Sequence, residues 1–165
     1  MILPEIQSRF RTIQEIDIPE ERLMILEPLV HYIQHKVDSG KDVNLNFICT
    51  HNSRRSQFSQ VWSQVAAHVF GFKAKSFSGG VEVTAFNQRA IASLKRSGFK
   101  IENDSGDNPR YKIYFAEDSE PILGFSKLFD DEVNPKTSFA AIMTCSHADE
   151  NCPFIPGTEK RIPLN

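Results

Sequence analysis

The chain has 165 residues, 40% of them hydrophobic and 24% charged, which is ordinary for a soluble globular protein able to bury one continuous core. Its net charge of -2 excludes a bulk positive field that would attract nucleic acid or an anionic membrane, so any anion site must be local. No apolar run reaches the length of a membrane span, and the N-terminus shows no basic region followed by an apolar one. We therefore expect a cytoplasmic protein with neither a nucleic-acid nor a membrane partner.

The first 42 residues show two helical patterns. Ile6, Phe10 and Ile13 share one helical face, and a second apolar pattern, residues 23–37, ends before Gly40. Pro28 lies inside the second pattern and predicts a kink or a restart of the helix. These patterns predict an N-terminal helical extension, residues 1–42, packed on a sheet domain of residues 43–165.

The next segments alternate between strand and helix. Gly71 stops the first helix, Ser78-Gly79-Gly80 ends the second strand, and Asn87 is a plausible cap for the second helix, which Gly98 terminates. The elements predicted in this order are a strand at 43–48, a helix at 56–69, a strand at 72–77 and a helix between 87 and 98. A strand–helix–strand–helix order favours right-handed βαβ units around a mostly parallel sheet.

The second half of the chain is richer in turns. Residues 100–110 form a polar connection, whereas 111–118 and 121–129 predict a hairpin because apolar residues alternate in the first of them. An apolar run, residues 139–144, ends in Cys145. The predicted fold class is α/β, a three-layer sandwich with a central mostly parallel sheet.

A cysteine stands between the first predicted strand and the helix that follows, in the stretch "CTHNSRRSQ", residues 49–57. Ligands of open α/β sheets bind beyond the carboxyl ends of strands, where helix N-termini offer unpaired N–H groups. Such groups and a nearby arginine lower a cysteine pKa from ~8.5 by one to several units. The planar fork of Arg55 suits a tetrahedral oxyanion. Cysteine is often simply buried, but Arg55 and Ser56 favour a thiolate nucleophile at Cys49.

The same stretch resembles the phosphate-binding loop of the low-molecular-weight protein tyrosine phosphatases and of the thioredoxin-coupled arsenate reductases, which share that fold. The family pattern, Cys-x5-Arg-Ser with an asparagine three positions after the cysteine, is met by Cys49, Asn52, Arg55 and Ser56. The resemblance implies that Ser56 donates to the thiolate and that Asn52 shapes the loop. The sequence departs from the family pattern at two positions, with His51 in place of the commoner glycine and Arg54 at a variable position. We expect these side chains either to crowd the anion pocket or to add binding groups to it. The implied oxyanion-binding residues are Thr50, His51, Asn52, Ser53, Arg54 and Arg55.

The distal stretch "IMTCSHADENCPFIPG", residues 142–157, resembles the redox loop of the arsenate reductases. The resemblance implies that Cys145 attacks the Cys49 adduct and that Cys152 resolves the resulting disulfide. We expect a mobile polar loop between them, because a disulfide requires Cα atoms within ~7 Å. A zinc site from Cys145, His147 and Cys152 lacks a fourth ligand, so neither a metal nor a cofactor is expected.

These features favour an arsenate reductase-like enzyme that reduces arsenate to arsenite through a thiol/disulfide relay, with a thioredoxin-like reductant. The first alternative is a phosphatase that hydrolyses phosphate monoesters through a cysteinyl-phosphate and ignores the distal cysteines. The second is a non-catalytic oxyanion- or partner-binding module. The N-terminal helices favour this alternative, because a catalytic core does not require them.

A general acid is missing from the pattern. Both families use an aspartate followed by proline to protonate the leaving oxygen, and this sequence has no Asp-Pro pair. In the reductases that aspartate follows the last redox cysteine, and the corresponding position in this chain would lie just beyond Asn165. We favour a shortened version of a longer protein over replacement of the acid by another carboxylate such as Asp149.

Overall fold

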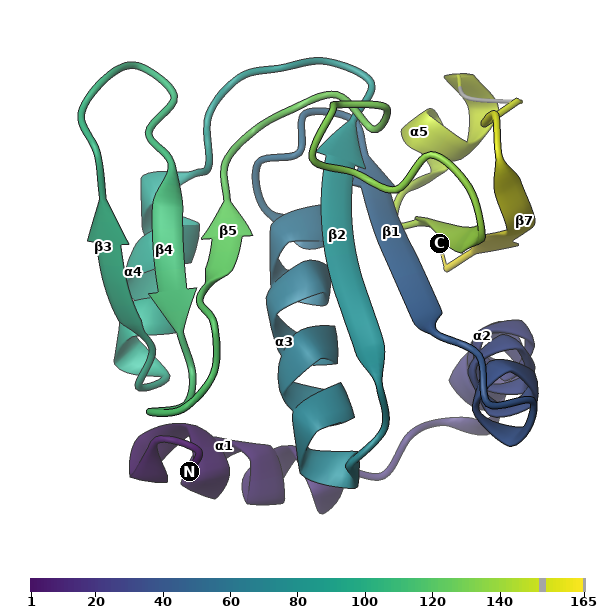
Figure 1. Cartoon of the computed structure of the whole chain (residues 1–165), viewed down its shortest axis with the longest axis horizontal. Coiled ribbons are helices and arrows are strands. Elements are labelled where there is room, and N and C mark those ends of the chain that lie inside the picture. Colours follow the sequence, from purple (N-terminus) through teal and green to yellow (C-terminus); the bar gives the residue numbers. More distant parts are fainter. Residues whose placement is uncertain (152–153, 165) are drawn as a thin grey trace.

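The computed structural model describes residues 1–151 and 154–164. Within this part of the chain, an N-terminal pair of helices is followed by strands and helices that alternate up to α4, then by four consecutive strands, a helix and a last strand (Figure 1). The elements are α1 (Pro4–Gln14), α2 (Glu20–Asp38), β1 (Val43–Cys49), α3 (Arg55–Phe70), β2 (Ala74–Gly80), α4 (Gln88–Arg96), β3 (Lys100–Asn103), β4 (Tyr111–Tyr114), β5 (Ile122–Gly124), β6 (Phe139–Met143), α5 (Ser146–Asn151) and β7 (Thr158–Pro163).

The central sheet has the strand order β2-β1-β6-β7, and all its pairings are parallel. Parallel sheets are covered on both faces, so their inner strands are apolar throughout. All five residues of β6 are buried, as are all but one in β1. The predicted α/β class and parallel sheet are confirmed. Strand β7 was not predicted, because its mostly polar residues show no apolar period and become a strand only by pairing with β6.

The two faces of the central sheet carry different apolar clusters. Leu45 and Phe47 of β1 pack with Tyr32 of α2, whereas Ile48 packs with Met143 of β6 and Ala148 of α5. This division follows from the alternation of side chains along a strand. Helix α2 contacts β1 and β7, α3 contacts β1 and β2, and α5 contacts β1 and β6, so helices flank the sheet as predicted (Figure 1).

A second, three-stranded antiparallel sheet has the order β3-β4-β5. The predicted hairpin is therefore confirmed as β4 and β5, although both strands are shorter than expected. Strand β3 corrects the prediction of a polar connection over residues 100–110. Its residues are mostly exposed, so they show no apolar pattern, and it becomes a strand by antiparallel backbone pairing with the next strand, β4. This sheet shares a core with α1, α3 and α4.

Strand β2 also corrects a prediction, since it continues through Ser78, Gly79 and Gly80 instead of ending before them. Glycine within a strand often marks a close approach of another backbone. A Cβ added at Gly79 would lie 2.2 Å from Cα of Phe129. The two glycines therefore permit close contacts at the end of β2, and they do not break the strand.

The residues that the N-terminal helices bury differ in part from those that their apolar patterns predict. Ile6 and Phe10 are buried as predicted, but Ile13 is 43% exposed. Helix α2 continues past Pro28 without a restart. Its predicted apolar face is also largely exposed, and Tyr32 and Lys36 are its buried residues, because only the half of the helix beyond the proline is anchored to the sheet. The division into an extension and a domain at residue 42 stays a prediction.

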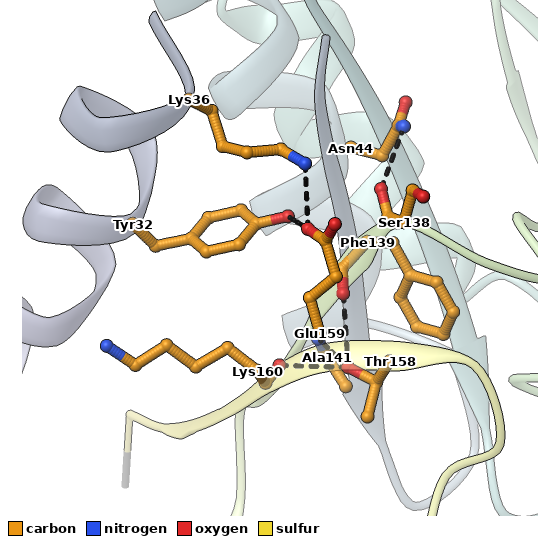
Figure 2. A network of polar contacts seen from close by, with 9 residues as sticks. All are labelled: Tyr32, Lys36, Asn44, Ser138, Phe139, Ala141, Thr158, Glu159 and Lys160. Atoms are coloured by element: carbon orange, nitrogen blue, oxygen red, sulfur yellow. Dashed lines mark hydrogen bonds and ion pairs between the residues drawn. The ribbon is translucent and has the colours of Figure 1, made fainter. Parts of the chain in front are cut away.

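A polar network joins α2 to β7 (Figure 2). The hydroxyl of Tyr32 and the ammonium of Lys36 each donate to Oε2 of Glu159 over 2.8 Å. The hydrogen bond from Lys36, aided by that from Tyr32, holds the pKa of Glu159 below its ordinary value although burial opposes this. Burial, with the same carboxylate, raises the pKa of Tyr32. Lys36 is 5% exposed, so Glu159 supplies the negative charge that its ammonium requires.

We expect Glu159→Gln to lower the free energy of unfolding at pH 7 by roughly 1.5 kcal/mol, the low end for a hydrogen bond to a charged group. The low end applies because the Glu159 side chain is 40% exposed. Folding lowers the pKa of Glu159. Its carboxylate therefore contributes to the free energy of unfolding above the unfolded pKa of ~4.3, and this contribution is lost as pH falls through the lower pKa of the folded state. Urea titrations at pH 7 and pH 3 measure both effects.

The matched control is Glu132→Gln, which changes an exposed carboxylate and should leave the urea midpoint unchanged. Equal midpoints for wild type and Glu159→Gln at pH 7 would show that the network does not stabilise the fold.

Across residues 1–151 and 154–164, none of the helices combines the length and apolar character needed to cross a membrane.

Candidate functional site

The loop between β1 and α3 is organised around Asn52. This residue is fully buried and has a φ of 46°, a left-handed conformation that asparagine tolerates better than most side chains. Its Nδ2 donates to Oγ of Ser56 over 2.8 Å, and its Oδ1 accepts from the backbone N–H of Lys127 at 3.1 Å and from Nε2 of Gln57 at 3.2 Å. These bonds support the prediction that Asn52 shapes the loop.

The end of β2 holds the same loop from the other side. The backbone N–H groups of Val81 and Glu82 donate to the carbonyl of Thr50 over 2.8 and 2.9 Å. A Cβ at Gly80 would lie 2.8 Å from both N of Asn52 and O of Thr50, so only glycine permits this approach. The strand pattern predicts only an end at these glycines and not this role, although two glycines inside a strand pattern are a signal of close backbone approach.

Cys49 and Ser56 face each other beneath the loop. The Cys49 Sγ and Ser56 Oγ atoms lie 3.0 Å apart, and both residues are buried. Because Oγ of Ser56 accepts a hydrogen bond from Asn52, its own proton is available to the sulfur. This geometry favours the predicted donation from Ser56 to a Cys49 thiolate.

A cavity of about 380 Å³ opens above these residues. Two arginine side chains and the start of α3 make it electropositive, and no carboxylate is found among its described lining residues. It therefore offers a local anion site in a chain of net charge -2. The lining residues are Cys49, His51, Ser53, Arg54, Arg55 and Phe58.

Two of the predicted oxyanion-binding residues are not among those lining the cavity. The Asn52 side chain points to Ser56 and Gln57, and the Thr50 hydroxyl lies 3.5 Å from Sγ of Cys145 and 3.2 Å from Nδ1 of His147. Thr50 thus links the loop to the segment that follows β6.

Cys145 is a free, buried thiol in the same apolar cluster as Cys49. Burial raises the pKa of Cys145, but hydrogen bonds from Thr50 and from the Ala148 backbone, with the positive charge of Arg55, outweigh burial and bring it below its ordinary value. A thiol that ionises more easily is a better nucleophile near neutral pH. The structure therefore brings two of the predicted catalytic cysteines to one site. Cys152 lies outside the described residues.

The six residues after Cys145 correct the prediction of a mobile polar loop, because they form α5. The helix begins with a hydrogen bond from the Asp149 N–H to the Cys145 carbonyl, buries Ala148, and is anchored by an ion pair of 2.7 Å between Asp149 and Arg161 of β7. Asp149 consequently faces β7 and does not line the cavity. Within the described part of the chain, no group of three or more His, Cys, Asp and Glu side chains is placed to hold a metal ion.

Lys127, whose backbone N–H donates to Asn52, is not among the residues that line the cavity. It is 3% exposed, and its ammonium finds no hydrogen-bond partner among the described residues, although it lies 4.6 Å from the ring centroid of Phe125. Burial lowers the pKa of Lys127 to about 8, with Asp131 opposing. No local pattern in the sequence indicates this residue, because only the tertiary structure brings it next to Asn52.

The fold and the site define an α/β protein with a cysteine-bearing loop after the first strand of a parallel sheet. Searches among curated proteins find Arsenate reductase 2 of Staphylococcus epidermidis and Arsenate reductase 1 of Staphylococcus saprophyticus, each 30% identical over 115 residues, which is 70% of this chain and 70% of the relative. An arsenate reductase of Staphylococcus aureus matches to the same extent. The chain therefore belongs to the arsenate reductase family.

No protein-family model matches the chain. A solved structure of a thioredoxin-dependent arsenate reductase from Corynebacterium glutamicum has a TM-score of 0.45 and 20% identity, covering 87% of this chain and 57% of that protein. The chain thus spans less than two thirds of the length of that structure.

We expect iodoacetamide at pH 6 to alkylate Cys49 faster than Cys145 or Cys152, and sulfate or phosphate to slow the reaction at Cys49 alone. The reason is that Cys49 lines the electropositive cavity and faces a hydroxyl donor, whereas Cys145 does not line it. Peptide mass spectrometry after short exposures measures the three rates. Equal rates without protection by anions would contradict the assignment of Cys49.

We expect Lys127→Met to raise the free energy of unfolding at pH 7. The pKa of Lys127 falls from 10.5 to about 8 on folding, a difference equivalent to about 3 kcal/mol at pH values below 8. Wild type should therefore gain stability relative to the variant between pH 8 and 10.5, where the unfolded chain holds more protons. Urea midpoints at pH 7 and pH 10 test this, with the exposed Lys112→Met as control. A lower midpoint for Lys127→Met at pH 7 would mean that its ammonium stabilises the fold.

Proposed function

We propose that this chain reduces arsenate to arsenite, with Cys49 as nucleophile, Arg55 as oxyanion clamp, and Cys145 and Cys152 as the redox pair. The observation that supports the proposal is the position of Cys145, whose Sγ lies 3.5 Å from the hydroxyl of Thr50, the residue next to Cys49. A phosphate-ester hydrolase needs no second thiol at its nucleophile, whereas a reductase needs one for each turnover.

The first step is the attack of the Cys49 thiolate on arsenic. A sulfur–arsenic bond forms, one arsenic–oxygen bond breaks, and arsenic remains in the pentavalent state. Ser56 stabilises the thiolate before the attack, and Arg55, with the N–H groups at the start of α3, binds the remaining oxygens. The cavity of about 380 Å³ has room for a tetrahedral oxyanion.

The second step is the attack of Cys145 on the Cys49 sulfur. A disulfide forms, and the electron pair of the sulfur–arsenic bond passes to arsenic, which leaves as trivalent arsenite. The lowered pKa of Cys145 favours this attack because it increases the thiolate fraction. Cys152 then attacks Cys145, which releases the Cys49 thiolate and leaves a Cys145–Cys152 disulfide. An external dithiol of the thioredoxin kind reduces that disulfide and completes the cycle.

Arsenate without a reductant should therefore produce one disulfide per chain, between Cys145 and Cys152. In Cys152→Ser the relay should stop one step earlier, at a Cys49–Cys145 disulfide. Peptide mapping by mass spectrometry, together with quantification of released arsenite, measures both products.

The matched control is Cys49→Ser, which should retain its other two thiols after exposure to arsenate because no adduct forms. Three free thiols in wild type after arsenate, together with hydrolysis of an aryl phosphate, would favour the phosphatase alternative.

A further inference from the structure

The cavity at the loop is larger than one tetrahedral oxyanion requires. Its volume is about 380 Å³. An arsenate ion, with five heavy atoms, displaces about as much space as five water molecules, or roughly 150 Å³ at ~30 Å³ for each water. More than half of the cavity therefore remains for other parts of a ligand.

Two arginine side chains line this cavity, and the proposed reaction assigns a role only to Arg55. Within residues 1–151 and 154–164, neither guanidinium forms a hydrogen bond or an ion pair. Arg54 is also exposed, so its side chain is free to turn toward a ligand. Its guanidinium carries N–H donors in a planar fork, and these donors are available to a second group in the cavity.

The two arginines leave the start of α3 in different directions. Arg54 is the N-cap of α3, and Arg55 is its first residue. Successive residues at a helix start are turned by about 100° around the helix axis, so the two side chains serve separate parts of the cavity. The backbone N–H of Phe58 donates to the Arg54 carbonyl over 2.9 Å. Because side chains four residues apart lie on one helix face, Arg54 and Phe58 form the same side of the cavity.

This side of the cavity offers two kinds of contact. The fork of Arg54 matches the two oxygens of a carboxylate, and the ring of Phe58 provides apolar surface. Phe58 also packs against the core cluster that contains Val61 and Val65, which holds the ring in place. A ligand that uses both contacts has two anionic groups joined by a short organic link, one group beside Cys49 and Arg55 and the other beside Arg54.

We propose that Arg54 and Phe58 form a subsite for a second anionic group, so that the substrates of this chain include pentavalent organic arsonates that carry a carboxylate; this inference rests on the proposed function. The Cys49 sulfur bonds to arsenic, and one arsenic oxygen leaves as water. Cys145 then attacks the Cys49 sulfur, and the electron pair of the sulfur–arsenic bond passes to arsenic. One arsonic acid and two thiols thus give one trivalent arsonous acid, one disulfide and one water, and the arsenic–carbon bond stays intact.

The first measurement is the binding of two unreactive analogues by isothermal titration calorimetry. Phosphonoacetate carries a carboxylate on its organic group, and methylphosphonate does not. Wild type should bind phosphonoacetate about tenfold more tightly, the low end for a hydrogen bond to a charged group, because Arg54 is exposed. Arg54→Gln should lose this preference. The matched control is Arg89→Gln, which removes the same charge from an exposed side chain that does not line the cavity and should keep the preference.

The second measurement is the loss of free thiols when the reductant-free chain meets arsenate, arsonoacetate or methylarsonate. Wild type should reach half of its maximal rate at an arsonoacetate concentration about tenfold below that of methylarsonate, and Arg54→Gln should need similar concentrations of both.

Two kinds of outcome are distinguishable. Equal affinities for the two phosphonates in wild type, a preference that survives in Arg54→Gln, or thiols that arsenate consumes and arsonoacetate does not, each overturn this inference and leave the proposed function intact. A wild-type chain that loses no thiol to arsenate overturns the proposed function and, with it, the reduction of organic arsonates.

Discussion

The geometry of the candidate site depends on the buried side chain of Asn52. Its left-handed backbone reverses the chain between β1 and α3, and its amide bonds to two segments at once: to Ser56 and Gln57 in the first turn of α3, and to the backbone of Lys127. The bond from Lys127 satisfies a buried backbone N–H, and leaving such a group unpaired costs roughly 1–3 kcal/mol. Because the same amide that supports the loop also orients the Ser56 hydroxyl, the conformation of the loop and the polarity around Cys49 are set together.

Helix α3 is held in place by polar contacts as well as by apolar packing. Nε2 of Gln57 donates to the Phe125 carbonyl over 2.8 Å, and the Gln60 side chain accepts from Ser78 of β2 over 2.6 Å and donates to the Leu123 carbonyl of β5 over 3.3 Å. Hydrogen bonds are directional, so they fix the helix in translation and rotation relative to both sheets. The first turn of α3, which lines the cavity, is therefore positioned by Gln57 within that turn and by Gln60 in the next turn.

The two described thiols occupy related positions on neighbouring strands. Cys49 ends β1, and Cys145 follows the end of β6, its parallel neighbour. Parallel strands bring their carboxyl ends to the same edge of the sheet, where loops and helix N-termini meet. Thr50 bridges the two segments through its hydroxyl, and Arg55 contributes positive charge to the surroundings of Cys145. The anion-binding loop and the second thiol are thus parts of one electrostatic environment.

The sequence alone determined the elements whose signals are local. The apolar run of β1, the amphipathic helix α3 with Gly71 after it, and the Asn87 cap all follow from periodicity and capping chemistry, which depend on neighbouring residues. It also singled out Cys49, with Arg55 and Ser56, because a thiol between strand and helix is recognisable from spacing, whereas Asn52 and Cys145 were implied by the resemblance to a known family. Tertiary structure decided the rest, namely the polar strands β3 and β7, the continuation of β2 through its glycines, the helix after Cys145, and the pairing of His51 with Glu82. Each of these arises from contacts between segments distant in sequence or from backbone pairing, and such contacts leave no periodic pattern in the residues that make them.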